Sequence, residues 1–123
     1  MQSNNPPPNP IVNVAELLAR VDNDAELLRE LIAIFKIELP HNLCVLREAI
    51  AQGNLKRVQK SGHMLRGMLS NLGATRGTAA AAQLEQLGDS SDHTALKSAL
   101  ALFESELIDL LPELEACVAK ARP

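Results

Sequence analysis

The most unusual feature of this 123-residue sequence is its lack of aromatic side chains, with two Phe and neither Tyr nor Trp. Domains that bind single-stranded nucleic acid stack bases on aromatic rings, so the scarcity argues against that class. Immunoglobulin-like sandwiches, which need a buried Trp and a corner Tyr, are disfavoured too. The core must consist of Leu, Ala, Ile and Val, and because Leu and Ala favour helices, we expect a single all-α domain.

Cysteines and long apolar runs are also scarce. The two cysteines, Cys44 and Cys117, lack metal-site spacing and lie inside helical patterns, so we interpret them as free, buried thiols in a reducing compartment. No apolar run is long enough to span a bilayer, and the first residues lack the pattern of a signal peptide. We therefore expect a cytoplasmic protein without direct membrane contact.

Acidic residues are missing from one long stretch. The whole chain carries a formal charge of −3, which argues against a general nucleic-acid or membrane-surface binder. Residues 49–84 contain no Asp or Glu but five Lys or Arg, so this stretch carries +5 and the rest of the chain −8. This distribution points to an acidic, phosphate-bearing partner. The five basic residues are Lys56, Arg57, Lys60, Arg66 and Arg76.

Capping residues and apolar periodicity predict five helices. Asn13, with Glu16 three residues later, can cap a short first helix, and Asp24 can cap a second that continues past Pro40 to about Gln52. Apolar residues recur every three or four positions along the longer helices. The remaining helices are expected at about 54–72, at about 75–87 and after residue 92.

These elements predict an up-down antiparallel four-helix bundle with a short N-terminal cap helix, because short connections make successive helices antiparallel. Gly73 and Gly88 occupy positions where left-handed C-terminal caps are expected. The bundle should cover residues 13–121, whereas the Pro- and Asn-rich residues 1–12 suggest a linker or a disordered N-terminus. A monomer is expected, because the apolar stripes face one core.

The third expected helix has the most informative polar face. On a helical wheel, His63 lies about 130° from the centre of the apolar stripe, so we expect it to be exposed among donors and cations. The stripe consists of Leu55, Val58, Leu65, Leu69 and Leu72. The opposite arc consists of Lys56, Gln59, Lys60, His63, Arg66, Gly67 and Ser70.

Two glycines inside this helix, Gly62 and Gly67, each cost about 1 kcal/mol relative to alanine. Gly67, one turn beyond His63, leaves the imidazole uncovered, and Arg66 offers a permanently charged planar group above the ring. No second His or carboxylate lies one turn away, so no metal is expected. The pattern suits a phosphoryl group on the imidazole, but a solvated face with glycines for close helix packing remains a serious alternative.

The run from His63 to Gly67 (His-Met-Leu-Arg-Gly), continued by Asn-Leu-Gly-Ala at 71–74, resembles the signature of the histidine-containing phosphotransfer (HPt) domain family. That signature is His, any residue, Leu, Lys and Gly, then small residues and a closing hydrophobic-Gly-Ala. The resemblance includes Leu84-Glu85 on the next helix and the order of helices, and it covers about residues 13–121.

The resemblance implies a phosphorelay carrier. His63 would accept a phosphoryl group from a receiver-domain phospho-aspartate or a sensor kinase and pass it to a response-regulator aspartate. Arg66 would replace the family's Lys in balancing phosphoryl charge, Gly67 would leave room for the docking receiver, and Gly73 would close the helix. The chain would need no cofactor of its own, since Mg²⁺ would belong to the receiver. The docking surface is expected to include Lys56, Gln59, Lys60, Met68 and Ser70.

Two features depart from the family pattern. Arg66 stands in place of Lys, and Glu85 occupies the position where some members carry a Gln that orients the imidazole. Gln83 and Gln86 lie nearby, so the orienting role is not assigned to Glu85. The remaining histidines and several acids are expected to be ordinary surface residues: His41, His93, Glu104, Glu106 and Asp109.

Expected partners are receiver domains and an upstream hybrid sensor histidine kinase. The module is either free-standing or the cytoplasmic part of a larger membrane-bound kinase. The sequence contains no Gly-rich phosphate loop followed by Lys-Ser/Thr, so we expect a carrier and not an enzyme. Two alternatives stay open: a bundle that docks signalling partners without carrying phosphate, and a purely structural helical adaptor.

Overall fold

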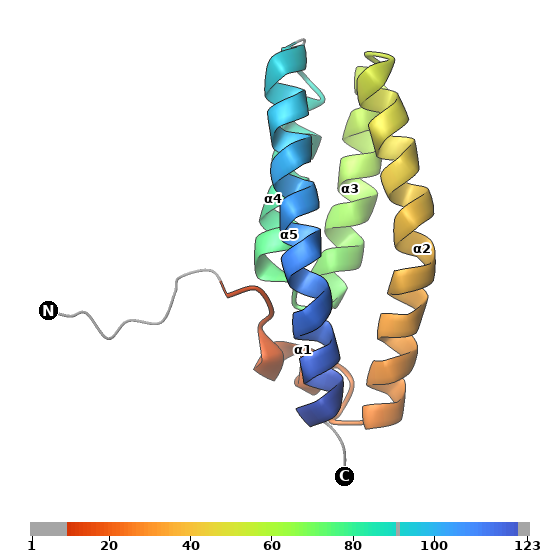
Figure 1. Ribbon diagram of the computed structural model, residues 1–123, viewed down its shortest axis with the longest axis vertical. Coiled ribbons are helices and arrows are strands. Elements are labelled where there is room, and N and C mark those ends of the chain that lie inside the picture. The colour runs from red at the N-terminus through yellow and green to blue at the C-terminus, as the bar shows by residue number, and fades with distance from the viewer. Residues whose placement is uncertain (1–9, 91, 121–123) are drawn as a thin grey trace, which may run out of the picture.

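The computed structural model describes residues 10–90 and 92–120, which form five helices and no strand. The prediction of an all-α fold is confirmed. Figure 1 shows the four long helices side by side, with the short α1 at one end of them. Within the described residues, no helix combines the length and apolarity needed to cross a membrane. The helices are α1 (Val14–Arg20), α2 (Ala25–Ala51), α3 (Leu55–Asn71), α4 (Thr75–Leu87) and α5 (His93–Lys120).

The first helices begin where their caps were predicted. Asn13 Oδ1 accepts the backbone N–H of Glu16 at 3.1 Å, and Asp24 Oδ1 accepts those of Glu26 and Leu27 at 3.0 and 3.1 Å. A side-chain cap of this kind contributes about 1 kcal/mol, because it satisfies backbone donors that have no partner within the helix. Local sequence therefore determines where α1 and α2 start.

One shared core holds the helices together. Helix α3 packs against α2 and α4, and α5 packs against the same two helices from the other side. Each fully buried Leu contributes about 1.5–3 kcal/mol relative to an exposed one. The buried residues of α2 and α5 recur every three or four positions, as the apolar spacing predicted. The largest fully buried side chains include Leu28 and Leu46 of α2, Leu65 and Leu69 of α3, Leu84 of α4, and Phe103, Leu110 and Leu114 of α5.

The two glycines expected as left-handed caps differ from each other. Gly73 has a φ of +64° and follows the end of α3, where the N–H of Asn13 donates to its carbonyl at 2.8 Å and so attaches α1. Gly88 has a φ of −60°, so the prediction of a left-handed cap is wrong there. A Cβ on Gly88 would lie 2.9 Å from Cα of Gln59. Gly88 is thus needed for a helix contact and not for a turn.

Three acids of α5 that were expected to be ordinary surface residues form ion pairs with neighbouring helices, and Glu104 and Glu106 are only partly exposed. Arg76 of α4 lies 3.0 Å from Glu106 and 3.8 Å from Asp109, and Arg47 of α2 lies 2.6 Å from Glu104. The side chain of Glu106 is only 15% exposed. Exposed pairs contribute at most about 1 kcal/mol each, but these pairs join α5 to both of its neighbours.

The two cysteines lie in different environments. Cys117 is buried, as expected, but Cys44 is exposed, because the core face of α2 at this level is formed by Leu39 and Leu46. Burial raises the pKa of the Cys117 thiol above its ordinary value. The prediction of two buried thiols is therefore wrong for Cys44.

This difference predicts the thiol chemistry of the folded protein. A thiolate-directed reagent at pH 8 should modify Cys44 and leave Cys117 unmodified, because a buried thiol is inaccessible and hard to ionise. Mass spectrometry of the labelled protein should give one adduct per chain in buffer and two in denaturant. A Cys44→Ser variant serves as the control and should give none in buffer. Rapid double labelling of the folded wild-type protein would contradict the burial of Cys117.

Candidate functional site

His63 projects from the middle of α3 into solvent. Helix α3 turns Val58, Leu65 and Leu69 into the core, and the imidazole on the opposite side is 68% exposed. Gly67, one turn further along, is exposed too, and a Cβ built on it would meet no atom within 4 Å. On the side of the imidazole that faces Gly67, the surface of α3 is therefore not covered by other side chains.

A carboxylate from the next helix reaches the imidazole. Glu85 of α4 places Oε2 2.9 Å from Nδ1 of His63 and Oε1 2.8 Å from Nε of Arg66. Its side chain is only 24% exposed. The imidazole of His63 therefore contacts an acid, Glu85, as well as the cation Arg66. The sequence-based interpretation gave Glu85 no orienting role and so missed this contact with the ring.

The contacts at Nδ1 favour one tautomer of His63. Nη2 of Arg66 also lies 3.0 Å from Nδ1, so both groups compete for this nitrogen. An unprotonated Nδ1 would bring two acceptors together at 2.9 Å from Glu85, and a protonated one would bring two donors together at 3.0 Å from Arg66. The contact with the carboxylate is the shorter of the two and becomes a charge-assisted hydrogen bond when Nδ1 carries the proton, so we assign the proton to Nδ1. With the proton on Nδ1, the lone pair on Nε2 is available for chemistry.

The charge of Glu85 is stabilised by these neighbours. Partial burial alone would raise the pKa of the Glu85 carboxyl, but the hydrogen bond from His63 and the positive charge of Arg66 outweigh it, and the pKa is lowered. The carboxylate is consequently ionised at neutral pH, and Arg66 neutralises it. The pair adds almost no net charge beside His63.

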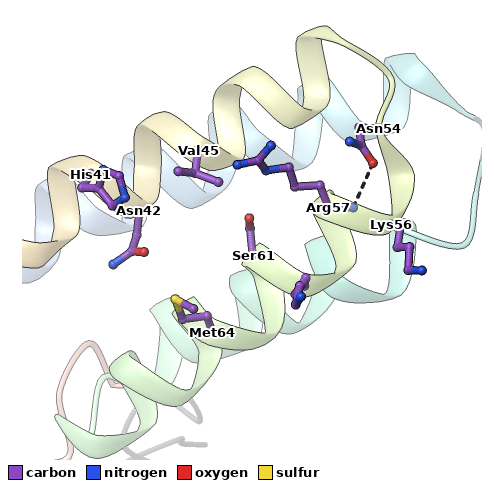
Figure 2. Close-up of a pocket in the computed structure, with 9 residues that line it drawn as sticks. His41, Asn42, Val45, Asn54, Lys56, Arg57, Ser61 and Met64 are labelled. Atoms are coloured by element: carbon purple, nitrogen blue, oxygen red, sulfur yellow. Dashed lines mark hydrogen bonds between the residues drawn. The ribbon is translucent and has the colours of Figure 1, made fainter.

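A groove runs between α2 and α3 on one flank of this site. Figure 2 shows Asn42 and Val45 of α2 opposite Ser61 and Met64 of α3 across it. The groove extends along the same two helices over apolar side chains, with exposed cations at its other end. Its apolar part includes Ile37, Met64 and Met68, and its basic part includes Lys56, Arg57 and Lys60.

The residues predicted to form the docking surface do not lie on one flank. Lys56, Lys60 and Met68 line the groove between α2 and α3. Gln59 lies on the other flank, where α3 meets α4. Ser70 is exposed near the end of α3. The predicted set therefore covers two different surfaces beside His63.

The prediction also missed residues from helices other than α3. Ile37 of α2 is 76% exposed and lies in the groove together with Met64. Its position outside the apolar stripe of the second helix was the signal that could have identified it. Six large apolar side chains of the described chain are exposed outside the core stripes. These residues are Leu27, Ile34, Ile37, Met64, Leu102 and Ile108. The monomeric state stays a prediction.

No metal centre is formed by the part of the chain that the structure describes, which contains no group of three or more His, Cys, Asp or Glu side chains able to hold an ion. His41 lines the groove, and His93 begins α5. Neither has the pair of Arg and Glu partners that surrounds His63.

Comparison with known proteins identifies one family. A family model described as Hpt domain matches residues 30–121, which is about three quarters of the chain. Comparisons with curated proteins and with solved structures gave no match. The matched region begins within α2 and contains His63, Arg66, Gly67 and Glu85.

The lowered pKa of Glu85 predicts how stability depends on pH. Its ionised form stabilises the fold above the ordinary Glu pKa of about 4.3, and this contribution disappears as the pH falls through the lower pKa of the folded state. Urea unfolding of the wild type and Glu85→Gln should therefore give free energies that differ most near pH 7 and converge below about pH 4. Arg66→Gln should converge with the wild type over the same range. Parallel curves from about pH 3 to 7 would refute the ion pair.

Proposed function

The chain belongs to the Hpt domain family, and on this basis we propose that it carries a phosphoryl group on His63 in a multistep phosphorelay. Hpt domains are phosphotransfer carriers that exchange phosphoryl groups with receiver domains and histidine kinases. One observation supports His63 as the acceptor: its imidazole is exposed while Glu85 holds Nδ1 at 2.9 Å. That arrangement combines access for a partner with a fixed ring orientation.

The chemistry follows from the tautomer. The lone pair of Nε2 attacks the phosphorus of a receiver aspartyl phosphate, an N–P bond forms, and the O–P bond breaks as the aspartate carboxylate leaves. The ring then carries a positive charge, which the hydrogen bond from Nδ1 to Glu85 stabilises. Onward transfer reverses the sequence, because the carboxylate of the next receiver attacks the phosphorus and the electron pair returns to Nε2.

Arg66 makes the site acceptable to an anion. A lone carboxylate beside His63 would repel a phosphoryl group, but Nε of Arg66 pairs with Glu85 at 2.8 Å and neutralises it. Nη2 of the same guanidinium lies on the imidazole side, 3.0 Å from Nδ1. Its N–H groups that do not contact the ring can bind an anion there. They are placed to compensate the charge of the phosphoryl oxygens.

Receiver domains dock, in this proposal, over the groove between α2 and α3. Ile37 and Met64 provide apolar contact close to His63, and Lys56 and Lys60 provide positive charge for an acidic partner. Gly67 leaves space for the receiver backbone, because even a Cβ at this position would touch no other part of the chain. The receiver supplies Mg²⁺, and the carrier needs no cofactor or nucleotide of its own.

We also infer an up-down antiparallel bundle of the four long helices, capped by α1, in a domain covering residues 13–121. The contacts between successive helices from α2 to α5, and between α5 and α2, support this arrangement. The linker or disordered terminus predicted for 1–12 falls mostly on residues 1–9, which lie outside the described residues. A cytoplasmic location stays a prediction of the proposal.

Phosphoryl transfer from purified receiver domains tests the role of His63. Labelled receiver phosphate should appear on the wild-type chain as acid-labile, base-stable label, and His63→Gln should abolish it. His93→Gln is the matched control, since His93 is also exposed and begins α5, which does not line the groove, and it should be labelled like the wild type. Label retained by His63→Gln would refute the assignment. No label on the wild type, with stable receiver binding, would support a docking module instead.

Two exposed isoleucines test the docking surface. Ile37→Asp places a charge in the groove, and we expect it to slow transfer from a receiver about tenfold or more, as loss of an interface anchor does. Ile108→Asp is the control, because Ile108 is 71% exposed on α5, which does not line the groove. Both variants should still accept phosphate from phosphoramidate, which needs no docking. Equal receiver kinetics for the two variants would remove the groove from the proposal.

A further inference from the structure

Helices α3 and α4 approach each other unusually closely beside His63. A Cβ on Gly62 would lie 2.8 Å from the backbone N and 3.0 Å from Cα of Glu85. The atoms in the way belong to the backbone, so no side-chain rotation could relieve the clash. Any residue larger than glycine at position 62 must move α4 away from α3.

A second contact fixes the register of the same two helices. A Cβ on Gly88 would lie 2.9 Å from Cα and 3.0 Å from N of Gln59. Gln59 and Gly62 lie about one turn apart on α3, and they face Gly88 and Glu85, which are separated by the same interval along the chain. Together the two contacts determine how far Glu85 lies from α3.

The second glycine inside α3 has the opposite environment. Gly67 is exposed and a Cβ added to it would meet no atom within 4 Å, whereas Gly62 is buried against α4. An interior helix glycine costs about 1 kcal/mol relative to alanine. At Gly62 the close helix contact explains why the cost is tolerated, and the contrast provides a matched pair of positions for experiment.

The close contact between α3 and α4 determines which group forms a hydrogen bond with Nδ1 of His63. Arg66 and His63 lie on the same helix and move together, but Glu85 lies on α4 and reaches Nδ1 only because the two backbones are close. A Cβ at position 62 would lie 2.8 Å from the backbone N of Glu85, so an ordinary contact of 3.4 Å or more would require Glu85 to move away from α3. The hydrogen bonds that join the Glu85 carboxylate to His63 and Arg66 would then lengthen, and hydrogen bonds weaken as they lengthen. Arg66 Nη2 would then remain beside Nδ1 as a donor.

We propose that Gly62 is a positioning residue for phosphotransfer, which acts on His63 through Glu85 by setting the separation of α3 and α4. With α4 in place, Nδ1 is protonated and Nε2 is the nucleophile. With α4 displaced, donation from Arg66 to Nδ1 favours a proton on Nε2, the atom that must attack phosphorus. The proposal rests on His63 being the phosphoryl acceptor.

Gly62→Ala and Gly67→Ala test this role as a matched pair. Long-range ¹H–¹⁵N spectra at pH 8 should show the Nδ1–H tautomer in the wild type and in Gly67→Ala, and a shift toward the Nε2–H tautomer in Gly62→Ala. Phosphorylation by phosphoramidate should slow about tenfold or more in Gly62→Ala, as expected for a small displacement of a positioned group. The rate control is Gly77→Ala, because the nearest atoms to a Cβ on Gly77 of α4 would be side-chain atoms of Leu69 at 3.3 Å and beyond, and its rate should match the wild type.

A second variant covers the case in which Gly62→Ala does not fold. Glu85→Asp keeps the helix contact at Gly62 but withdraws the carboxylate by one methylene, so it should produce the same tautomer shift and the same loss of rate. An unchanged tautomer in either folded variant would overturn the proposal, even if the rate fell, because the rate loss would then have another cause.

The two proposals fail in distinguishable ways. A wild-type chain that accepts no phosphoryl group on His63 from receivers or from phosphoramidate would refute the proposed function. The spectra of the unphosphorylated protein would still report whether Gly62 controls the tautomer. A phosphorylated wild type would refute the role of Gly62 alone if Gly62→Ala gave the spectrum of Gly67→Ala and the rate of Gly77→Ala.

Discussion

The site depends on one contact, the close approach of the α3 and α4 backbones at Gly62 and Glu85. It brings a carboxylate from a different helix within hydrogen-bonding distance of an imidazole that is otherwise exposed to solvent. The same contact places this carboxylate 2.8 Å from Nε of Arg66, so the negative charge of Glu85 and the positive charge of Arg66 cancel beside the ring. A rigid bundle thus orients an imidazole at a surface position, where solvent would otherwise leave the ring free to reorient.

The helices were predictable because their signals are local. Asn13 and Asp24 cap the residues that follow them, and apolar spacing within each helix determines which face is buried. Errors arose where the outcome depends on a neighbouring helix. Gly88 resembles a turn glycine in sequence but accommodates Gln59, and Glu106 resembles a surface acid but pairs with Arg76. Neither partner lies near its residue in the chain.

The same limit applies to the site. His63, Arg66 and Gly67 lie within five residues on one helix, so a helical wheel was sufficient to group them. Glu85 is separated from His63 by twenty-two residues, and its role depends on a helix spacing that periodicity does not encode. Ile37 comes from yet another helix. Family membership supports the chemistry, but the arrangement of charges around this particular imidazole depends on how α4 packs against α3.

The groove between α2 and α3 has a consequence for the order of events in a relay. If receivers dock over this groove, as proposed, one imidazole beside one groove accommodates a single receiver at a time, and a donor and an acceptor compete for the same surface. The carrier would have to release the donor receiver before it bound the acceptor receiver. An excess of either receiver in its unphosphorylated form would then occupy the groove and slow phosphoryl transfer. In such a relay, relative receiver concentrations would determine where the phosphate goes as much as the chemistry proposed at His63.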